Sequence, residues 1–201
     1  MKNIFKQLTV MIFLIGLAGC SLGPLHMEPE TTYMIDTLPQ HVTTRKPQGI
    51  NILVMLPETA PAYNTTQMAY TIKPYQVAYF GKNRFAETPA QMLHPLIVQT
   101  LQKTNFFHAV IMPPTMGRYQ YILNTRILQL QQNFTHRPPG VELIVLAQLS
   151  QVETNQVITT QLFSIHEPII YRTPYGGVLA ANHATEKLLR ELALFCLKKI
   201  Q

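Results

Sequence analysis

Apolar and polar positions alternate over three long segments in the second half of the chain. They cover residues 119–134, 141–153 and 156–166, and in each a run of residues is apolar at every second position. This period of two is typical of a strand with one buried face. Pro138-Pro139-Gly140 and Thr154-Asn155 separate the segments, and short links of this kind join antiparallel neighbours. The pattern predicts a three-stranded antiparallel meander.

Two further stretches before the meander show strand patterns. Residues 50–56 are almost all apolar and end at Pro57, which is typical of a central strand buried on both faces. Apolar residues then alternate at 68–72 and again at 77–79, on either side of Pro74. A proline between two alternating runs indicates a turn, so we expect two short strands here.

The first helix is expected to begin at Thr88-Pro89, because a hydroxyl suits the N-cap and proline suits the first helical position. Apolar residues follow at the helical period, at Leu93, Leu96, Ile97 and Leu101. The spacing predicts a helix over 89–103, irregular near Pro95, which lacks the amide for one helical hydrogen bond. A short strand is expected at 106–112.

A second helix is expected from Gly176-Gly177 to Lys199. One of its faces carries Ala181, Ala184, Leu188, Leu192, Phe195 and Cys196. Together with the strands, the two helices predict a single α+β domain over residues 48–201. In it, both helices pack on one face of an antiparallel-dominated sheet.

The N-terminal stretch has the charge-then-hydrophobe order of a secretory signal. Lys2 and Lys6 precede an apolar run over 8–17, and this run is shorter than the roughly 20 residues that span a bilayer. Leu17-Ala18-Gly19-Cys20 resembles the bacterial lipobox. The resemblance implies that residues 1–19 are removed and that Cys20 carries a diacylglyceryl group and an N-acyl chain. The alternative is an ordinary signal peptide.

The residues after the lipobox bear on membrane and domain organisation. In Gram-negative lipoproteins an aspartate directly after the cysteine commonly retains the protein at the inner membrane, and here Ser21 favours the outer membrane. Residues 20–47 are poor in large apolar residues and rich in Pro and Thr, which predicts a flexible tether. Tyr33-Met34-Ile35 is the exception, a β-prone patch able to add an edge strand.

Composition argues against several functions. Without Lys2 and Lys6, 14 basic residues stand against 10 acidic ones, a charge of +4, and no basic run exceeds two residues. Nucleic-acid binding is therefore not expected. The chain has two cysteines, Cys20 and Cys196. Because Cys20 is expected to carry the lipid, Cys196 has no partner for an intramolecular disulfide. Its apolar surroundings indicate a small buried hydrophobe.

The chain shows no constellation for catalysis. The only aspartate, Asp36, lies in the expected tether, and no serine lies in a Gly-x-Ser-x-Gly elbow. Convergence of His108, His166 and Glu167 would give a metal site, although ordinary surface histidines explain these residues more simply. We expect binding or assembly, with no enzyme activity, metal or cofactor.

Four short motifs carry a resemblance to a known family. They are Leu53-Val54-Met55-Leu56-Pro57, Met68-Ala69-Tyr70, Arg84-Phe85-Ala86-Glu87-Thr88-Pro89-Ala90 and Phe106-Phe107-His108-Ala109-Val110. In order and spacing they resemble the ABC-type transport auxiliary lipoproteins, the PqiC-like components of Mce-type lipid transport systems. Phe85 departs from the tryptophan that the family usually carries, and the chain has no tryptophan.

The resemblance implies a non-enzymatic lipoprotein anchored in the outer membrane and facing the periplasm. It would dock the Mce-domain periplasmic protein of a system that moves phospholipid or another lipophilic molecule between the two membranes. An inner-membrane permease and ATPase would supply the energy, and a homo-oligomer is compatible with this role. The alternative is an envelope or outer-membrane assembly lipoprotein with a similar layered fold.

Five aromatic residues are candidates for partner binding: Tyr70, Tyr75, Tyr79, Phe80 and Phe85. They lie within sixteen residues, more than one strand pair can bury on a single face. We therefore expect some of the rings to be exposed, and exposed aromatic rings commonly anchor protein interfaces. The alternative is that they pack under the helix that begins at Pro89.

Overall fold

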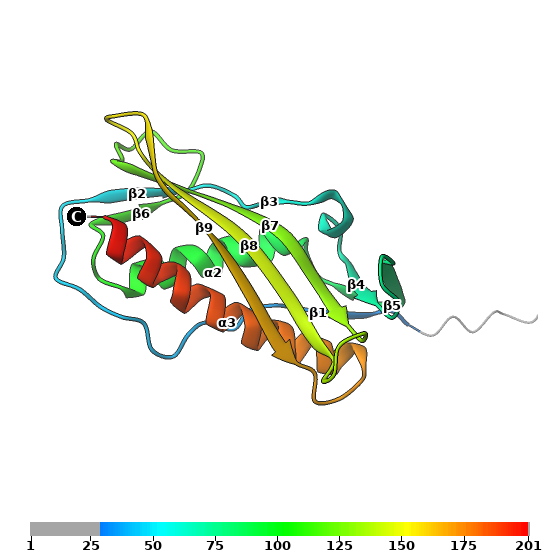
Figure 1. The fold of residues 1–201 in the computed structure, drawn as a ribbon. Coiled ribbons are helices and arrows are strands. Elements are labelled where there is room, and N and C mark those ends of the chain that lie inside the picture. The colour runs from blue at the N-terminus through cyan, green and yellow to red at the C-terminus, as the bar shows by residue number, and fades with distance from the viewer. Residues whose placement is uncertain (1–28, 201) are drawn as a thin grey trace, which may run out of the picture.

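The computed structural model describes residues 29–200 and folds them into one sheet covered by two helices (Figure 1). The helices are α2 (Pro89–Lys103) and α3 (Pro174–Lys199), and a short 3-10 helix, η2, spans Pro61–Tyr63. The described strands are β1 (Thr31–Tyr33), β2 (Asn51–Val54), β3 (Glu58–Thr59), β4 (Gln67–Thr71), β5 (Ala78–Phe85), β6 (Ala109–Ile111), β7 (Tyr121–Asn133), β8 (Gly140–Gln151) and β9 (Gln156–Pro168).

The sheet is built on the long strand β7. One edge of β7 pairs with β8 along its whole length, and β9 continues the sheet beyond β8. Its other edge pairs in turn with β2, β3 and β4. From these short strands the sheet extends to β6 on one side and through β5 to β1 on the other. The meander, the β4–β5 hairpin and the placement of β2 between two neighbours confirm the sequence predictions.

The prediction of an antiparallel-dominated sheet is wrong. Five of the eight pairings between described strands are parallel, and three are antiparallel. The reason is that β2, β3 and β4 follow one another in the same direction along one edge of β7, so each is parallel to it. The result is a curled, mixed sheet, in which the long pairings of β7, β8 and β9 are the antiparallel ones.

Helix α2 has the predicted bounds. The backbone N–H of Thr88 donates to Gln91 Oε1 at 3.0 Å and so caps the helix start. The helix continues through Pro95, which faces solvent. The strand expected after this helix is shorter than predicted, since β6 covers only Ala109–Ile111.

Helix α3 begins earlier than predicted, at Pro174, and Thr173 Oγ1 accepts the N–H of Gly176 at 3.0 Å. The two glycines therefore lie in its first turn. A Cβ on Gly177 would lie 2.0 Å from Gln132 Cδ, so glycine allows the helix to approach β7 this closely. The predicted apolar face of the helix, described above, is buried.

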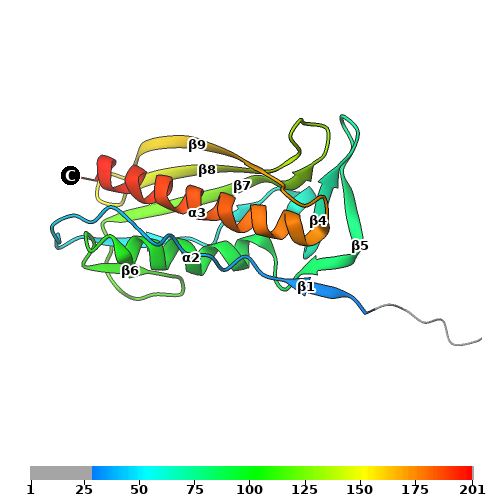
Figure 2. The ribbon, with the colours of Figure 1, turned by 90° about the horizontal axis from the view of Figure 1, so that it is seen from below.

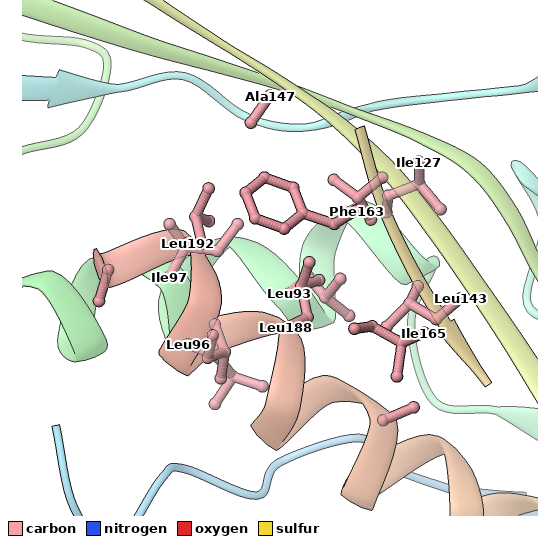
Figure 3. Packing of buried hydrophobic residues seen from close by; sticks show 14 of the residues in the cluster. Leu93, Leu96, Ile97, Ile127, Leu143, Ala147, Phe163, Ile165, Leu188 and Leu192 are labelled. Atoms are coloured by element: carbon pink, nitrogen blue, oxygen red, sulfur yellow. The ribbon is translucent and has the colours of Figure 1, made fainter. Parts of the chain in front are cut away.

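The two helices lie side by side on one face of the sheet (Figure 2). Figure 3 shows side chains of both helices meeting those of the sheet, and the buried residues it labels include Ile97, Ile127, Phe163, Leu188 and Leu192. Cys196 is buried in the same core, and burial raises its thiol pKa to about 12. The thiol thus stays protonated, as expected of a small buried hydrophobe.

The described part of the predicted tether, residues 29–47, is packed on the domain. Strand β1 pairs with β5 as the expected edge strand, and Ile35 is buried in the core. Asn182 Oδ1 accepts backbone N–H groups of the segment, and Arg45 Nη1 donates to the carbonyl of Leu197 at 2.6 Å. The prediction is therefore corrected: a few spaced apolar residues suffice to bind a segment of polar average composition. Residues 20–28 and Cys20 lie outside the described residues.

Candidate interaction surface

Both α-helices of residues 29–200 lie on one side of the sheet (Figures 1 and 2). The opposite side, here called the outer face, is contacted by the short 3-10 helix η2. Directly paired residues of neighbouring strands point to the same face. The pairings join Tyr79, Ala69, Gln131, Glu142 and His166 in one row across β5, β4, β7, β8 and β9. This row lies on the outer face, because the helices cover the alternate residues.

The carboxylate of Glu142 is the centre of a group of polar side chains on this face. It accepts hydrogen bonds from Gln129 Nε2, from Gln131 Nε2 at 3.2 Å and from Asn133 Nδ2 at 2.9 Å. His136 Nε2 lies 3.3 Å from its Oε1, and the Glu142 side chain is only 17% exposed. The carboxylate is thus held in one orientation by three amide donors from β7, and His136 of the β7–β8 loop lies beside it.

Tyr63 of η2 extends this group toward the edge of the sheet. Its hydroxyl donates to Gln131 Oε1 at 3.0 Å. Burial raises the pKa of Tyr63, and the nearby Glu142 and Tyr79 raise it further. The hydroxyl therefore stays neutral and keeps donating. We call Tyr63, Gln129, Gln131, Asn133, His136 and Glu142 the polar cluster.

The structure does not bring the five predicted aromatic residues together. Phe85 is buried in the core, and the rings of Tyr70 and Phe80 pack at a centroid distance of 4.5 Å. Tyr79 lies on the outer face, and its hydroxyl donates to the carbonyl of Ala62 at 2.8 Å. Tyr75 is fully exposed in the β4–β5 turn. The expected exposure is confirmed for Tyr75 and Tyr79, and partner binding stays a prediction.

Apolar side chains lie beside the polar cluster on the outer face. Leu146 of β8 is paired with Leu162 of β9, which is 56% exposed. On its other side Leu146 is paired with Arg126, which forms an ion pair with Glu58 at 2.9 Å. Met55, Leu56 and Leu146 are among the residues that line a hollow of about 300 Å³ here. Such a mixture of apolar and polar groups is typical of protein-binding surfaces.

The combination of histidines and glutamate considered for a metal does not form a site. His166 and Glu167 are successive residues of β9, so they point to opposite faces. Glu167 pairs with Lys187 of α3 on the helix side. Within residues 29–200, no three His, Cys, Asp or Glu side chains are close enough together to hold a metal ion.

The polar cluster was missed in the sequence, although a signal for it exists. Amide side chains stand at alternate positions Gln129, Gln131 and Asn133 of β7, and Glu142 is the only acidic residue of β8. Alternation alone places the three amides on one face. What it does not show is that Glu142 lies opposite them, because this depends on the register of β7 and β8.

Solved structures resemble this fold at low sequence identity. A crystal structure of a Xanthomonas campestris protein is 17% identical with a TM-score of 0.76, and the match covers 84% of this chain and 95% of that one. An uncharacterised protein is 13% identical with a TM-score of 0.68, covering 84% and 99%. A hypothetical protein of Chlamydia trachomatis is 11% identical with a TM-score of 0.51, covering 75% and 97%. These likenesses show the fold alone.

Sequence comparison is more specific. No curated protein sequence is similar enough to this chain to indicate a relationship. The profile of the family described as ABC-type transport auxiliary lipoprotein component matches residues 33–193, from β1 into α3. The match indicates no catalytic family. This chain therefore belongs to the family of ABC-type transport auxiliary lipoprotein components.

Proposed function

We propose that this chain is the outer-membrane-anchored periplasmic lipoprotein of an Mce-type ABC system. In this role it docks the Mce-domain periplasmic protein through which phospholipid or another lipophilic molecule passes between the membranes. The observation that carries the proposal is the family match over residues 33–193. The lipobox at Cys20 supports membrane anchoring, and Ser21 supports the outer membrane.

The chain's own chemistry supports docking over catalysis. Its nine glycines form no phosphate-binding loop of the Gly-x-x-x-x-Gly-Lys type. The energy for transport must then come from the ATPase of the system. The oxygens of Glu142, the acidic group at the centre of the polar cluster, are already engaged by Gln129, Gln131 and Asn133. This network serves to hold a surface in shape.

The docking surface in this proposal is the outer face. Neither α-helix of residues 29–200 covers it, it is held rigid by the polar cluster, and it offers exposed apolar groups such as Leu162. Of the five aromatic candidates, Tyr79 is the one that lies exposed on this face. Tyrosine is one of the residues that most often carry the binding energy of protein interfaces.

Capture of the purified Mce-domain protein by the lipoprotein in detergent tests the docking surface. Leu162→Arg places a charge among the exposed apolar groups of this face, and we expect the affinity to fall at least about tenfold, or about 1.4 kcal/mol. Tyr79→Ala should weaken capture in the same direction. The melting temperature should change little for Leu162→Arg, because the side chain is already exposed.

Leu179→Arg is the matched control, since Leu179 is an exposed leucine on α3 and thus on the helix side. We expect it to bind like the unaltered protein. Equal capture by all variants would refute the outer face as the docking surface. So would an equal loss in the Leu179→Arg control.

A further inference from the structure

Three loops gather at the end of the domain where the described chain begins. They are the β4–β5 turn (residues 72–77), the β7–β8 loop (residues 134–139) and the β9–α3 loop (residues 169–173). Figures 1 and 2 both show them at the end from which the chain leaves β1. The N–H of Phe134 donates to the carbonyl of Thr71 at 2.9 Å, and the rings of Tyr33 in β1 and Tyr175 in α3 lie 6.0 Å apart.

This end exposes apolar and aromatic side chains. Tyr75 is fully exposed, and Ile72 beside it is more than half exposed. In the β9–α3 loop, Ile170 is 83% and Tyr171 is 62% exposed. Within residues 29–200 no part of the chain covers them. Tyrosine is enriched where a protein meets the bilayer surface, because its ring is apolar and its hydroxyl is polar.

The charges of the three loops have one sign. Each loop carries one exposed basic residue, respectively Lys73, Arg137 and Arg172, and none of the three contains an aspartate or glutamate. Basic side chains near a membrane are attracted to anionic headgroups. Aromatic and basic groups together match the headgroup region of a bilayer, where tyrosine rings lie at the level of the headgroups and basic side chains meet the lipid phosphates.

The lipid anchor restricts which end can face the membrane. Eleven residue spacings separate Cys20 from Thr31, so the two cannot be more than roughly 40 Å apart. Helix α3 has 26 residues and is therefore about 39 Å long. It runs from this end of the domain to the other (Figure 2). Only an almost fully extended connection would place the anchor at the far end.

We propose that this end of the domain rests on the bilayer that holds the anchor, with Ile72, Tyr75, Ile170 and Tyr171 in the headgroup region. The proposal rests on lipidation of Cys20, which belongs to the proposed function. Lys73, Arg137 and Arg172 face the lipid phosphates in this arrangement. The domain then extends away from the bilayer, and its far end and outer face point into the aqueous compartment.

The absence of tryptophan from the chain allows single-tryptophan reporters. Tyr75→Trp and Tyr171→Trp place a reporter in two of the loops, and Met116→Trp places one in the exposed connection between β6 and β7 at the opposite end. The lipidated full chains are reconstituted in phosphatidylethanolamine and phosphatidylglycerol vesicles with brominated acyl chains. In these vesicles we expect the tryptophan fluorescence of the first two variants to be quenched and shifted to shorter wavelength. We expect neither change for Met116→Trp.

Vesicle flotation separates this proposal from the lipid anchor. If the protein floats but Tyr75→Trp and Tyr171→Trp are quenched no more than Met116→Trp, the proposed membrane contact is wrong and the lipid anchor is still supported. Protein that does not float overturns both. Circular dichroism of each variant confirms that the fold is unaltered, which is expected because all three side chains are exposed.

Discussion

Cys20→Ser is expected to abolish lipidation. In the proposed function the thiol of Cys20 accepts the lipid. Each buried methylene of a lipid chain contributes about 0.8 kcal/mol, so several chains would hold the protein firmly. No helix within residues 29–200 is long and apolar enough to span a bilayer. The variant should accumulate as an uncleaved precursor or be released in soluble form. Incorporation of radiolabelled palmitate measures this, and continued labelling would show that the anchor lies elsewhere.

Ser21→Asp is the matched variant for sorting. It keeps Cys20 and should therefore keep the lipid label, while the protein moves toward inner-membrane fractions. Unchanged fractionation on a density gradient would remove the argument for the outer membrane and leave the lipid anchor in place.

Leu192→Ala is expected to lower the free energy of unfolding by about 2 to 5 kcal/mol, because deleting a buried leucine loses its packing and leaves a cavity. Leu192 is 1% exposed. Figure 3 shows it near Ile97 of α2, on the side of α3 that faces the core. Urea unfolding measures the loss through the transition midpoint.

Glu191→Ala is the control for this substitution, since Glu191 is the exposed neighbour on the same helix. It should change stability by no more than about 0.5 kcal/mol. Lys187 is a poorer control because it pairs with Glu167. Equally small losses for Leu192→Ala and Glu191→Ala would contradict the packing of α3 on the sheet.

The long elements could be predicted because their patterns repeat. Strands β7, β8 and β9 are each more than ten residues long and each contains a run of alternating residues, and the apolar positions of α2 and α3 recur over several turns. The start of α2 was predictable for a local reason, the hydroxyl and proline of Thr88-Pro89. The start of α3 carries the same signal in Thr173-Pro174, but Gly176 and Gly177 just after it indicate a break unless their close approach to neighbouring chain is known.

Pairing between distant segments could not be predicted. Strands β2, β3 and β4 have two to five residues each, and nothing in such short runs shows that all three follow one edge of β7. The same reason explains why residues 29–47 were predicted to be a flexible tether. Residues 29–47 have a polar average composition, but Ile35 and Arg45 find partners that lie far away in the sequence.

The candidate surface was predictable only in part. The exposure of some rings near Pro74 followed from their crowding, and Tyr75 and Tyr79 confirm it. The polar cluster joins η2, β7, the β7–β8 loop and β8. Which residues of β7 lie opposite Glu142 depends on the register shift between the two strands at Ile127 and Gln129. An irregularity of this kind changes which residues face each other, and the buried apolar positions of β7 change from odd numbers up to Ile127 to the even-numbered Leu130 across it.

Affinity purification of the lipidated protein from mild-detergent extracts of the cell envelope, with mass spectrometry of the bound proteins, tests most directly whether this family member serves Mce-type transport. We expect an Mce-domain protein to co-purify, together with its permease and ATPase. Recovery of outer-membrane assembly components without any Mce-domain protein would contradict the transport role and support an envelope-assembly lipoprotein in its place.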